Sequence, residues 1–370
     1  MSSCKDSLSL MAMWGSIARF DPKHERSFEG PEKRLEVIMR VVDGTHVSGL
    51  LAHDDDVWQK VIDAICAHIV SREFNEYIRS YVLSESSLFV MKDRVILITC
   101  GTITLLNCVP LICEAVSTVC GEVEWVSFMH KNYSFPWEQK GPHLSMAEEF
   151  KTLRSHFPSG QPFIFGPIDS DHYFLYFHSD VVQPSCSDDA QLSMTMYGLD
   201  RNQTKHWYSD KMLPTGPETA VIREATGLSE VVDDSWILHD LQYEPCGYSI
   251  NAIRGSEYQT IHITPEEHCS FASYETNTCA LNYSKCICGV LRVFDPERFS
   301  VIVFIDPDSA VGKSYHSGGT IGVEPEYYPN YEAHHRTVNE YTPGHWVLKV
   351  NYVKRAVGTV GTSAASGAKE

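Results

Sequence analysis

The segment Tyr81-Val82-Leu83-Ser84-Glu85-Ser86-Ser87-Leu88-Phe89-Val90 places a polar insert between two apolar, strand-like runs. Such runs, joined by a few small polar residues, are typical of an antiparallel β-hairpin. A third strand-like run, residues 94–99, follows directly. The local pattern therefore predicts consecutive antiparallel strands, and it gives the polar insert no more than the role of a solvated turn.

Strand-like patterns also dominate the rest of the chain, and many of them are aromatic. They cover residues 162–165, 173–177, 258–263, 299–305 and 347–353. Helical spacing of apolar residues predicts helices over residues 54–71, 146–156 and 221–225, and from Thr102 toward Cys120-Gly121. Because strands outnumber helices and hairpin connections look tight, we expect an α+β fold with antiparallel sheets and helices outside them.

The chain carries 48 acidic and 30 basic residues, which give a formal net charge of −18. Nucleic-acid binding needs a basic stripe, and the sequence has none, so nucleic acid is not an expected partner. The longest uncharged stretch, residues 95–113, is interrupted by Gly101 and several threonines. These residues favour a buried strand followed by a helix over a membrane span. The N-terminus is too polar for a secretory signal.

The 12 cysteines form neither a disulfide framework nor a pattern of metal ligands. Free thiols are typical of a reducing compartment, so we expect a cytoplasmic protein without a metal site. Residues 1–26 form a poorly patterned N-terminal extension, and residues 357–370, rich in Gly, Ser, Thr and Ala, are predicted to be a disordered tail. Residues 27–356 between them are predicted to form a single domain.

The sequence around the hairpin resembles the eukaryotic, pyruvoyl-dependent S-adenosylmethionine decarboxylases. Further blocks of that family recur in order: Phe28-Glu29-Gly30, Glu32-Lys33, Thr99-Cys100-Gly101-Thr102, Pro245-Cys246-Gly247-Tyr248-Ser249, Thr260-Ile261-His262-Ile263-Thr264-Pro265-Glu266 and Tyr274-Glu275-Thr276-Asn277. Together with the hairpin they span residues 28–277 and are jointly specific. The resemblance implies an αββα sandwich, in which two antiparallel sheets carry helices on their outer faces.

The resemblance also implies that the chain is a proenzyme that cleaves itself after Glu85. Ser86 would attack the preceding carbonyl, and β-elimination with hydrolysis would leave a pyruvoyl group at residue 86. The products would be a β chain, residues 1–85, and an α chain, residues 86–370. The family assigns this processing to positions that match Ser249 and His262, and a histidine is suited to proton transfer near neutral pH.

By resemblance, the pyruvoyl group forms a Schiff base with S-adenosylmethionine, whose decarboxylation supplies the aminopropyl donor for spermidine biosynthesis. Cys100 matches the family's proton donor, and Glu29 and Glu32 match two acidic residues of the active site. Phe28 and Tyr243 match an aromatic pair that stacks on adenine, although Tyr243 replaces the usual phenylalanine.

Three further residues match the substrate-binding positions of the family. Glu266 matches the carboxylate that accepts hydrogen bonds from the ribose hydroxyls. Leu83 and Glu85 stand where the backbone of the family contacts the edge of the base.

Many members of the family bind putrescine as an activator in a buried acidic cluster. Its acidic members match Glu36, Asp189 and Glu275. Ser193 stands where a glutamate is common, and Ile98 stands where a lysine is common.

Arg34 lies between Glu32 and Glu36, in a position where the family often has leucine. On a strand these three side chains share a face, whereas on a helix they do not, and the local pattern leaves the choice open. If the strand forms, Arg34 lies among buried carboxylates and partly replaces the diamine. The alternative is that Arg34 is a solvated surface charge.

These departures and the N-terminal extension are most similar to the trypanosomatid branch of the family. That branch pairs its catalytic subunit with an inactive paralogue that activates it, so such a partner is implied by analogy. Three alternatives stay open: the inactive paralogue itself, a non-catalytic module that binds adenosyl compounds or polyamines, and a cysteine hydrolase using Cys100 and His262. Intact Ser86, Cys100, Ser249 and His262 argue against the inactive paralogue.

Overall fold

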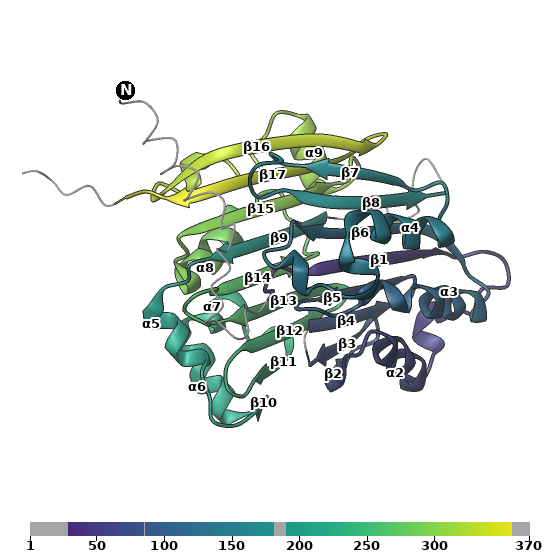
Figure 1. Cartoon of the computed structure of the whole chain (residues 1–370), viewed down its shortest axis with the longest axis horizontal. Helices are drawn as coiled ribbons and strands as arrows, with labels where there is room; N and C mark the ends of the chain where they lie inside the picture. Colours follow the sequence, from purple (N-terminus) through teal and green to yellow (C-terminus); the bar gives the residue numbers. More distant parts are fainter. Residues whose placement is uncertain (1–28, 85, 181–189, 357–370) are drawn as a thin grey trace, which may run out of the picture.

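Two antiparallel sheets face each other in the computed structural model, which describes residues 29–84, 86–180 and 190–356 (Figure 1). Sheet A has eight strands in the spatial order β2 (Ile69–Phe74), β3 (Ile78–Leu83), β4 (Ser86–Met91), β5 (Arg94–Thr99), β1 (Lys33–Arg40), β6 (Glu122–Lys131), β8 (Tyr173–Ser179) and β7 (Gln161–Phe165). The predicted hairpin of residues 81–90 thus lies inside this sheet, with Leu83 opposite Ser86.

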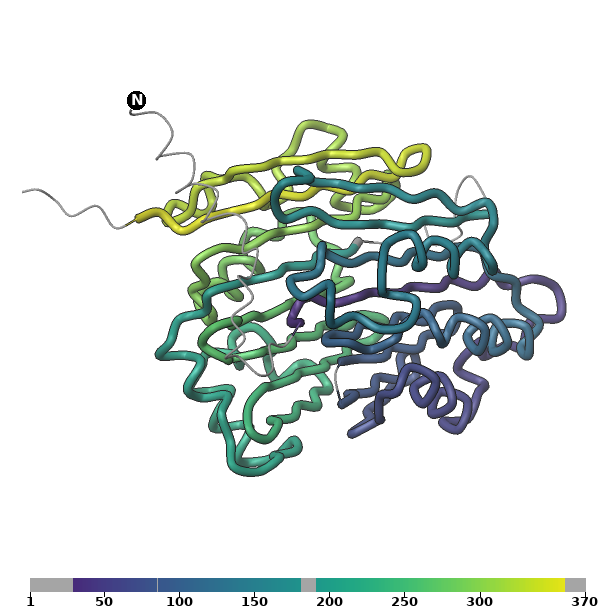
Figure 2. Tube along the Cα trace, in the orientation of Figure 1, coloured from purple at the N-terminus to yellow at the C-terminus, as the bar shows by residue number. Residues whose placement is uncertain are grey.

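Sheet B has nine strands and is built from the second half of the described chain, as Figure 2 shows by colour. Their order is β10 (Leu213–Pro214), β11 (Ile237–Gln242), β12 (Tyr248–Arg254), β13 (Glu257–Thr264), β14 (Phe271–Thr276), β9 (Ala190–Tyr197), β15 (Arg298–Ile305), β17 (His345–Lys354) and β16 (Tyr331–Thr342). The expected sandwich of two antiparallel sheets is therefore confirmed.

Helices cover the outer face of each sheet (Figure 1). Sheet A carries α2 (Asp55–Ala64), α3 (Val109–Thr118) and α4 (Met146–His156). The helices α5 (Arg201–Thr204), α6 (Pro217–Thr226), α7 (Leu228–Val231) and α8 (Ser284–Phe294) lie on the side of sheet B, and α9 (Ala310–His316) follows β15. No helix in the described ranges is long and apolar enough to cross a membrane.

The two large apolar cores lie between sheets and helices, not between the two sheets. One face of sheet B is apolar from strand to strand, through Ile250, Ile261, Tyr274, Met194, Val301 and Val350. The facing side carries two polar rows: Ser249, His262, Ser273 and Thr195, and beside them Asn251, Thr260, Glu275 and Ser193. The layer between the sheets is therefore largely polar at its centre, with small apolar clusters on both sides of it.

Two predicted helices differ from those observed. The helix expected over residues 54–71 ends at Ala64, because Cys66 takes a left-handed backbone (φ 63°) and the chain then enters the edge strand β2. The helix expected from Thr102 begins only at Val109, after a 3₁₀ turn over Leu105–Cys108. Pro110 has no amide hydrogen and fits only the first turn of an α-helix, which explains the late start.

The predicted helix over residues 146–156 is confirmed as α4, and the predicted strand over residues 94–99 is confirmed as β5. The helix α8 and the strand β6 were not predicted. Lys33–Arg40 form the strand β1, so the choice left open around Arg34 is settled in favour of a strand on which Arg34 and Glu36 share a face. Glu32 directly precedes the strand and reaches Ser273 of sheet B from the same side.

We predict that Phe89→Ala lowers the free energy of unfolding by about 3–5 kcal/mol, since Phe89 is fully buried and stacks on Tyr258 across the sheets at 4.4 Å. Denaturant-induced unfolding measures the loss. Phe74→Ala is the matched control, because Phe74 lies on the edge strand with 69% of its surface exposed, and its loss should stay within about 0.5 kcal/mol. Equal losses for both variants would contradict this packing.

Candidate active site

Ser86 and Cys100 lie together at the end of the β4–β5 ladder. Ser86 opens β4 and is paired with Thr99 of β5, which places the next residue, Cys100, beside it. The Ser86 Oγ accepts a hydrogen bond from the backbone N–H of Cys100 at 2.9 Å and lies 3.7 Å from the Cys100 Sγ. Both residues are buried. The thiol of Cys100 is therefore in contact with Ser86, the first residue of the neighbouring strand.

Ser249 and His262 are direct neighbours on β12 and β13. The Ser249 Oγ lies 2.8 Å from His262 Nδ1, and His262 Nε2 lies 3.0 Å from the Oγ of Ser87, on the other sheet. Burial lowers the pKa of His262 to about 4, so the ring is neutral at physiological pH. A neutral imidazole with one free nitrogen can act as a base.

Ser87 joins the two sheets beside this pair. Its hydroxyl oxygen lies 2.6 Å from Asn251 Oδ1 and 3.3 Å from Thr260 Oγ1. Asn251 in turn donates to the carbonyl of Tyr81 at 3.1 Å. The polar residue after Ser86 is thus held by sheet B on several sides, which fixes the position of the hairpin.

Glu29 and Glu32 have different surroundings. The Glu29 carboxylate accepts the backbone N–H groups of Ser134 and Phe135 at 2.9 and 2.6 Å, and its own carbonyl accepts the N–H of Gly101. Burial nevertheless raises the pKa of Glu29. Glu32 is partly buried between the sheets and accepts a hydrogen bond from Ser273 at 2.7 Å. Burial, reinforced by the charge of Glu275, raises the pKa of Glu32 to about 8.

The expected substrate-binding residues are only partly described. Phe28 and Glu85 lie outside the described residues. The hydroxyl of Tyr243 donates to the carbonyl of Leu83 at 2.8 Å and lies 3.2 Å from Ser249 Oγ. Glu266 is half-buried just beyond the end of β13, where burial raises its pKa. The structure therefore joins Leu83, Tyr243 and the Ser249–His262 pair, and it places Glu266 beyond the same strand.

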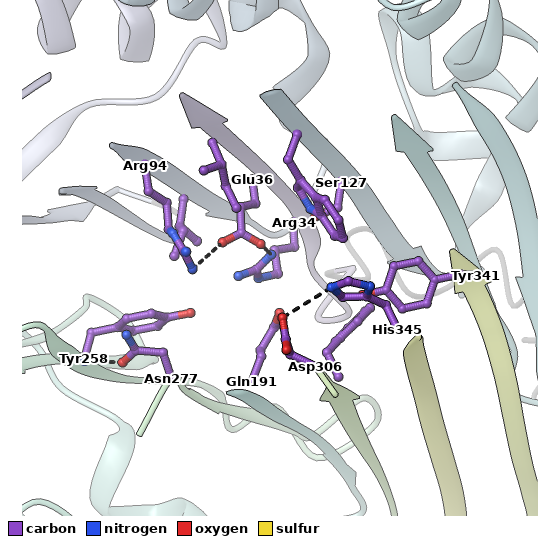
Figure 3. Close-up of a pocket in the computed structure, with 14 residues that line it drawn as sticks. Arg34, Glu36, Arg94, Ser127, Gln191, Tyr258, Asn277, Asp306, Tyr341 and His345 are labelled. Carbon is purple, nitrogen blue, oxygen red and sulfur yellow. Dashed lines mark hydrogen bonds and ion pairs between the residues drawn. The ribbon is translucent and has the colours of Figure 1, made fainter. Parts of the chain in front are cut away.

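Arg34 lies at the centre of a buried ion-pair network between the sheets (Figure 3). Its guanidinium donates to Glu275 at 2.8 Å and to Glu36 at 3.0 Å, and Arg94 donates to the other oxygen of Glu36 at 3.1 Å. Burial alone would raise the pKa of Glu36, but Arg34 and Arg94 outweigh it and lower that pKa. Asp189 lies outside the described residues. The alternative of Arg34 as a solvated surface charge is wrong, because its side chain is almost fully buried.

Arg34, Glu36 and Arg94 line a cavity of about 60 Å³, whose opposite wall carries Asp306 paired with His345 at 3.2 Å (Figure 3). One water needs roughly 10–15 Å³ of such space, so the cavity has room for several waters or a thin aliphatic chain. No group of three or more histidine, cysteine, aspartate or glutamate residues in the described part of the chain is arranged to hold a metal ion.

Several residues of these networks were not predicted from the sequence. Asn251 and Thr260 each lie two residues from Ser249 or His262, so the alternation of a strand could have placed them on the same face. No comparable signal marks Arg94, since its contact with Glu36 depends on the register of β1 against β5.

We predict that Glu32→Gln stabilises the protein at neutral pH, by an amount of the order of 2 kcal/mol at pH 7. The pKa of Glu32 is raised in the folded state, so its contribution is fully present below pH 4.5 and is lost as the pH rises through about 8. Glutamine keeps the hydrogen bond from Ser273 but does not titrate. The stability difference between variant and wild type should therefore grow from pH 5 to pH 8.

Unfolding free energies measured across this range test the expectation. Glu148→Gln, at an exposed position of α4, is the matched control. A difference that does not change with pH would contradict the assigned protonation of Glu32.

The chain matches known proteins over most of its length. Residues 25–353 match the family model for adenosylmethionine decarboxylase. A Trypanosoma cruzi protein named S-adenosylmethionine decarboxylase proenzyme is 70% identical over 357 residues, which cover 96% of both chains. A Leishmania infantum protein of the same name is 64% identical over 369 residues, which cover 100% of this chain and 94% of that protein.

A solved structure gives the same result. The crystal structure of the Trypanosoma brucei AdoMetDC-delta26 monomer is 92% identical, with a TM-score of 0.63, and the match covers 73% of this chain and 99% of that one. The solved structure agrees with the arrangement of two antiparallel sheets described above. The chain belongs to the adenosylmethionine decarboxylase family.

Proposed function

We propose that this chain is a self-processing S-adenosylmethionine decarboxylase whose pyruvoyl group derives from Ser86. The observation that carries the proposal is the contact of Ser86 with Cys100 on one side of the hairpin, and of Ser87 with His262 on the other. Ser86 is thus in contact with a thiol, and the residue that follows it is in contact with a neutral base. A non-catalytic binding module has no need of this combination.

In the proposed processing, the Ser86 Oγ attacks the carbonyl carbon of residue 85, and the peptide C–N bond breaks as the ester forms. A base then removes the α-proton of Ser86, and the Cβ–O bond of the ester breaks. This elimination releases residue 85 as a carboxylate and leaves a dehydroalanine. Its imine tautomer takes up one water and loses ammonia, which gives the pyruvoyl group. His262 is the proposed base and Ser249 its partner.

The solved Trypanosoma brucei chain supports this division of the polypeptide. It aligns to 73% of this chain over 99% of its own length. Residues 86–356 make up about the same share of the 370 residues of this chain. We propose the β chain 1–85 and the α chain 86–370 as products, with residues 27–356 as one domain, because the site draws on both sheets.

The surroundings of Ser86 fit a pyruvoyl group, since the residue is buried and its side chain is in contact with the backbone and thiol of Cys100. A pyruvoyl carbonyl supplies an electron sink that condenses with the substrate amine and promotes loss of carbon dioxide. Cys100 is the proposed donor of the proton to the substrate Cα. Glu29 holds the loop at Ser134 and Phe135 against Gly101, and thereby supports the position of Cys100.

We propose that Phe28 and Tyr243 stack on the adenine of S-adenosylmethionine, that Glu266 accepts hydrogen bonds from the ribose, and that the backbone at Leu83 and Glu85 contacts the base. None of the ten described cysteines forms a disulfide, which supports a cytoplasmic location. A catalytically inactive paralogue as activating partner remains part of the proposal by analogy with the trypanosomatid relatives.

Putrescine is the proposed ligand of the cavity beside Arg34. Ile98, which stands where a lysine is common in the family, lies directly opposite Arg34 on the neighbouring strand. The cation of the cluster is thus supplied here by β1, and not by β5 as the resemblance to the family implied. Arg34 and Arg94 together already neutralise Glu36 and Glu275, so a bound diamine has less charge to compensate, and we expect a modest activating effect.

Intact mass spectrometry of the denatured protein tests the function. We predict two chains, one ending at Glu85 and one beginning with a pyruvoyl-blocked residue 86, and release of carbon dioxide from S-adenosylmethionine. Ser86→Ala should give one uncut, inactive chain. Cys100→Ala should be cut but turn over at least about tenfold more slowly. Cys108→Ala, at a buried cysteine in the apolar core whose thiol donates to the Leu105 carbonyl, is the matched control.

A single chain of 370 residues from the wild type that stays uncut would overturn the proposed processing. Wild-type turnover by Cys100→Ala would show that Cys100 is not the proton donor and would leave the proposed processing at Ser86 unaffected.

We predict that Arg34→Leu lowers basal activity and increases the relative stimulation by putrescine. The change leaves Glu275 buried without its cation, at a cost of about 3–5 kcal/mol of stability that a bound diamine would partly restore. Activity and melting temperature are measured with and without putrescine. Arg40→Leu, on the same strand but exposed and paired with Glu122, is the matched control. Unchanged activity and putrescine response would contradict the assigned role of Arg34.

A further inference from the structure

The hydroxyl of Tyr243 connects the hairpin to the processing pair. It lies 2.8 Å from the carbonyl oxygen of Leu83, the residue paired with Ser86 across the hairpin. It also lies 3.2 Å from Ser249 Oγ. Since His262 contacts Ser249 through Nδ1 and Ser87 through Nε2, the contacts form one chain from Leu83 to Ser87. Leu83 and Ser87, the two ends of this series of hydrogen bonds, flank the peptide bond between residues 85 and 86 in the sequence.

The number of protons fixes the direction of these hydrogen bonds. A tyrosine hydroxyl has one proton, and a backbone carbonyl can only accept, so Tyr243 donates to Leu83. The contact between Tyr243 and Ser249 then needs the proton of Ser249. With that proton used, the Ser249 Oγ accepts a hydrogen bond from Nδ1–H of His262.

The remaining nitrogen of His262 is therefore unprotonated. His262 is neutral because burial lowers its pKa to about 4, and a neutral ring carries a single N–H. Its Nε2 lies 3.0 Å from Ser87 Oγ and 3.1 Å from Thr260 Oγ1, each of which can donate to it. The hydroxyl that does not donate to Nε2 has Asn251 Oδ1 as its acceptor.

Without the hydroxyl of residue 243 this restriction is lost. Ser249 would be free to donate its proton to Nδ1, and His262 would then carry its hydrogen on Nε2. Ser87 and Thr260 could both donate to Asn251 Oδ1, which has two lone pairs. Phenylalanine at position 243 therefore permits both tautomers of His262, whereas with tyrosine the Nε2–H tautomer leaves the contact between Tyr243 and Ser249 without a proton.

We propose that Tyr243 is a positioning residue for self-cleavage, because its hydroxyl holds the Leu83 carbonyl and keeps His262 as the Nδ1–H tautomer with its free nitrogen toward β4. This inference rests on the proposed function of His262 as the processing base. It adds a role for the hydroxyl of Tyr243 that is separate from the stacking face of its ring.

The first test compares the rate of chain cleavage in freshly synthesised wild type and Tyr243→Phe. We expect cleavage to slow by about tenfold, the rate equivalent of one hydrogen bond, and to slow more than kcat/KM of the processed enzyme. Tyr176→Phe is the matched control, because its hydroxyl also donates to a backbone carbonyl, that of Phe157, but has no link to His262. A wild-type rate for Tyr243→Phe overturns the inference and leaves the proposed function intact.

The second test observes the tautomer directly by nitrogen NMR of histidine-labelled Ser86→Ala protein, which stays uncut. The His262 signal is identified by its loss in the Ser86→Ala, His262→Asn double variant. We expect the Nδ1–H form with Tyr243, and a mixture when Tyr243→Phe is added. An Nε2–H form in the protein that keeps Tyr243 overturns the inference, whatever the stability of the phenylalanine variant.

Discussion

The polar layer between the two sheets is the constraint on which the rest of the structure depends. A buried polar group without a partner costs about 1–3 kcal/mol, and several side chains of this layer have their partner on the opposite sheet. Three such hydrogen bonds join Ser87 to Asn251, Ser273 to Glu32, and Ser80 to His239. These pairs all cross from one sheet to the other. Apolar packing can slide, but hydrogen bonds of this kind are satisfied only when the sheets are docked in one position.

This constraint places the charge network and the processing pair on one face of sheet B. Glu275 and Ser273 lie two residues apart on β14, and Thr260 and His262 lie two apart on β13. Glu32 is the link between them, because it accepts from Ser273 and senses the charge of Glu275. A change of charge at Arg34 therefore acts on Glu32 through the low-dielectric interior, and on the residues next to it in the same rows.

The sequence allowed the antiparallel class and the borders of regular elements such as α4 and β5 to be predicted. It also brought Ser86, Cys100, Ser249 and His262 together through resemblance to a family, since nothing in local periodicity singles them out. The choice between strand and helix at Arg34 needed the pairing of β1 with β5 and β6. Contacts such as Ser87 with Asn251 depend on how two sheets dock across more than 160 residues of chain, which no local pattern encodes.

The interior reaches charge balance through protonation as well as through ion pairs. Arg34 and Arg94 face Glu36 and Glu275, which leaves no cation for Glu32, and its pKa of about 8 keeps it neutral.

A second cluster has the opposite excess. Lys131, Arg298 and Lys349 all contact Asp171, and burial lowers the pKa of Lys349 to about 7. In each cluster the group without an ion-pair partner, Glu32 in the first and Lys349 in the second, has its pKa shifted toward the neutral form. Because these groups titrate near neutrality, a bound cation or anion between the sheets would change their protonation.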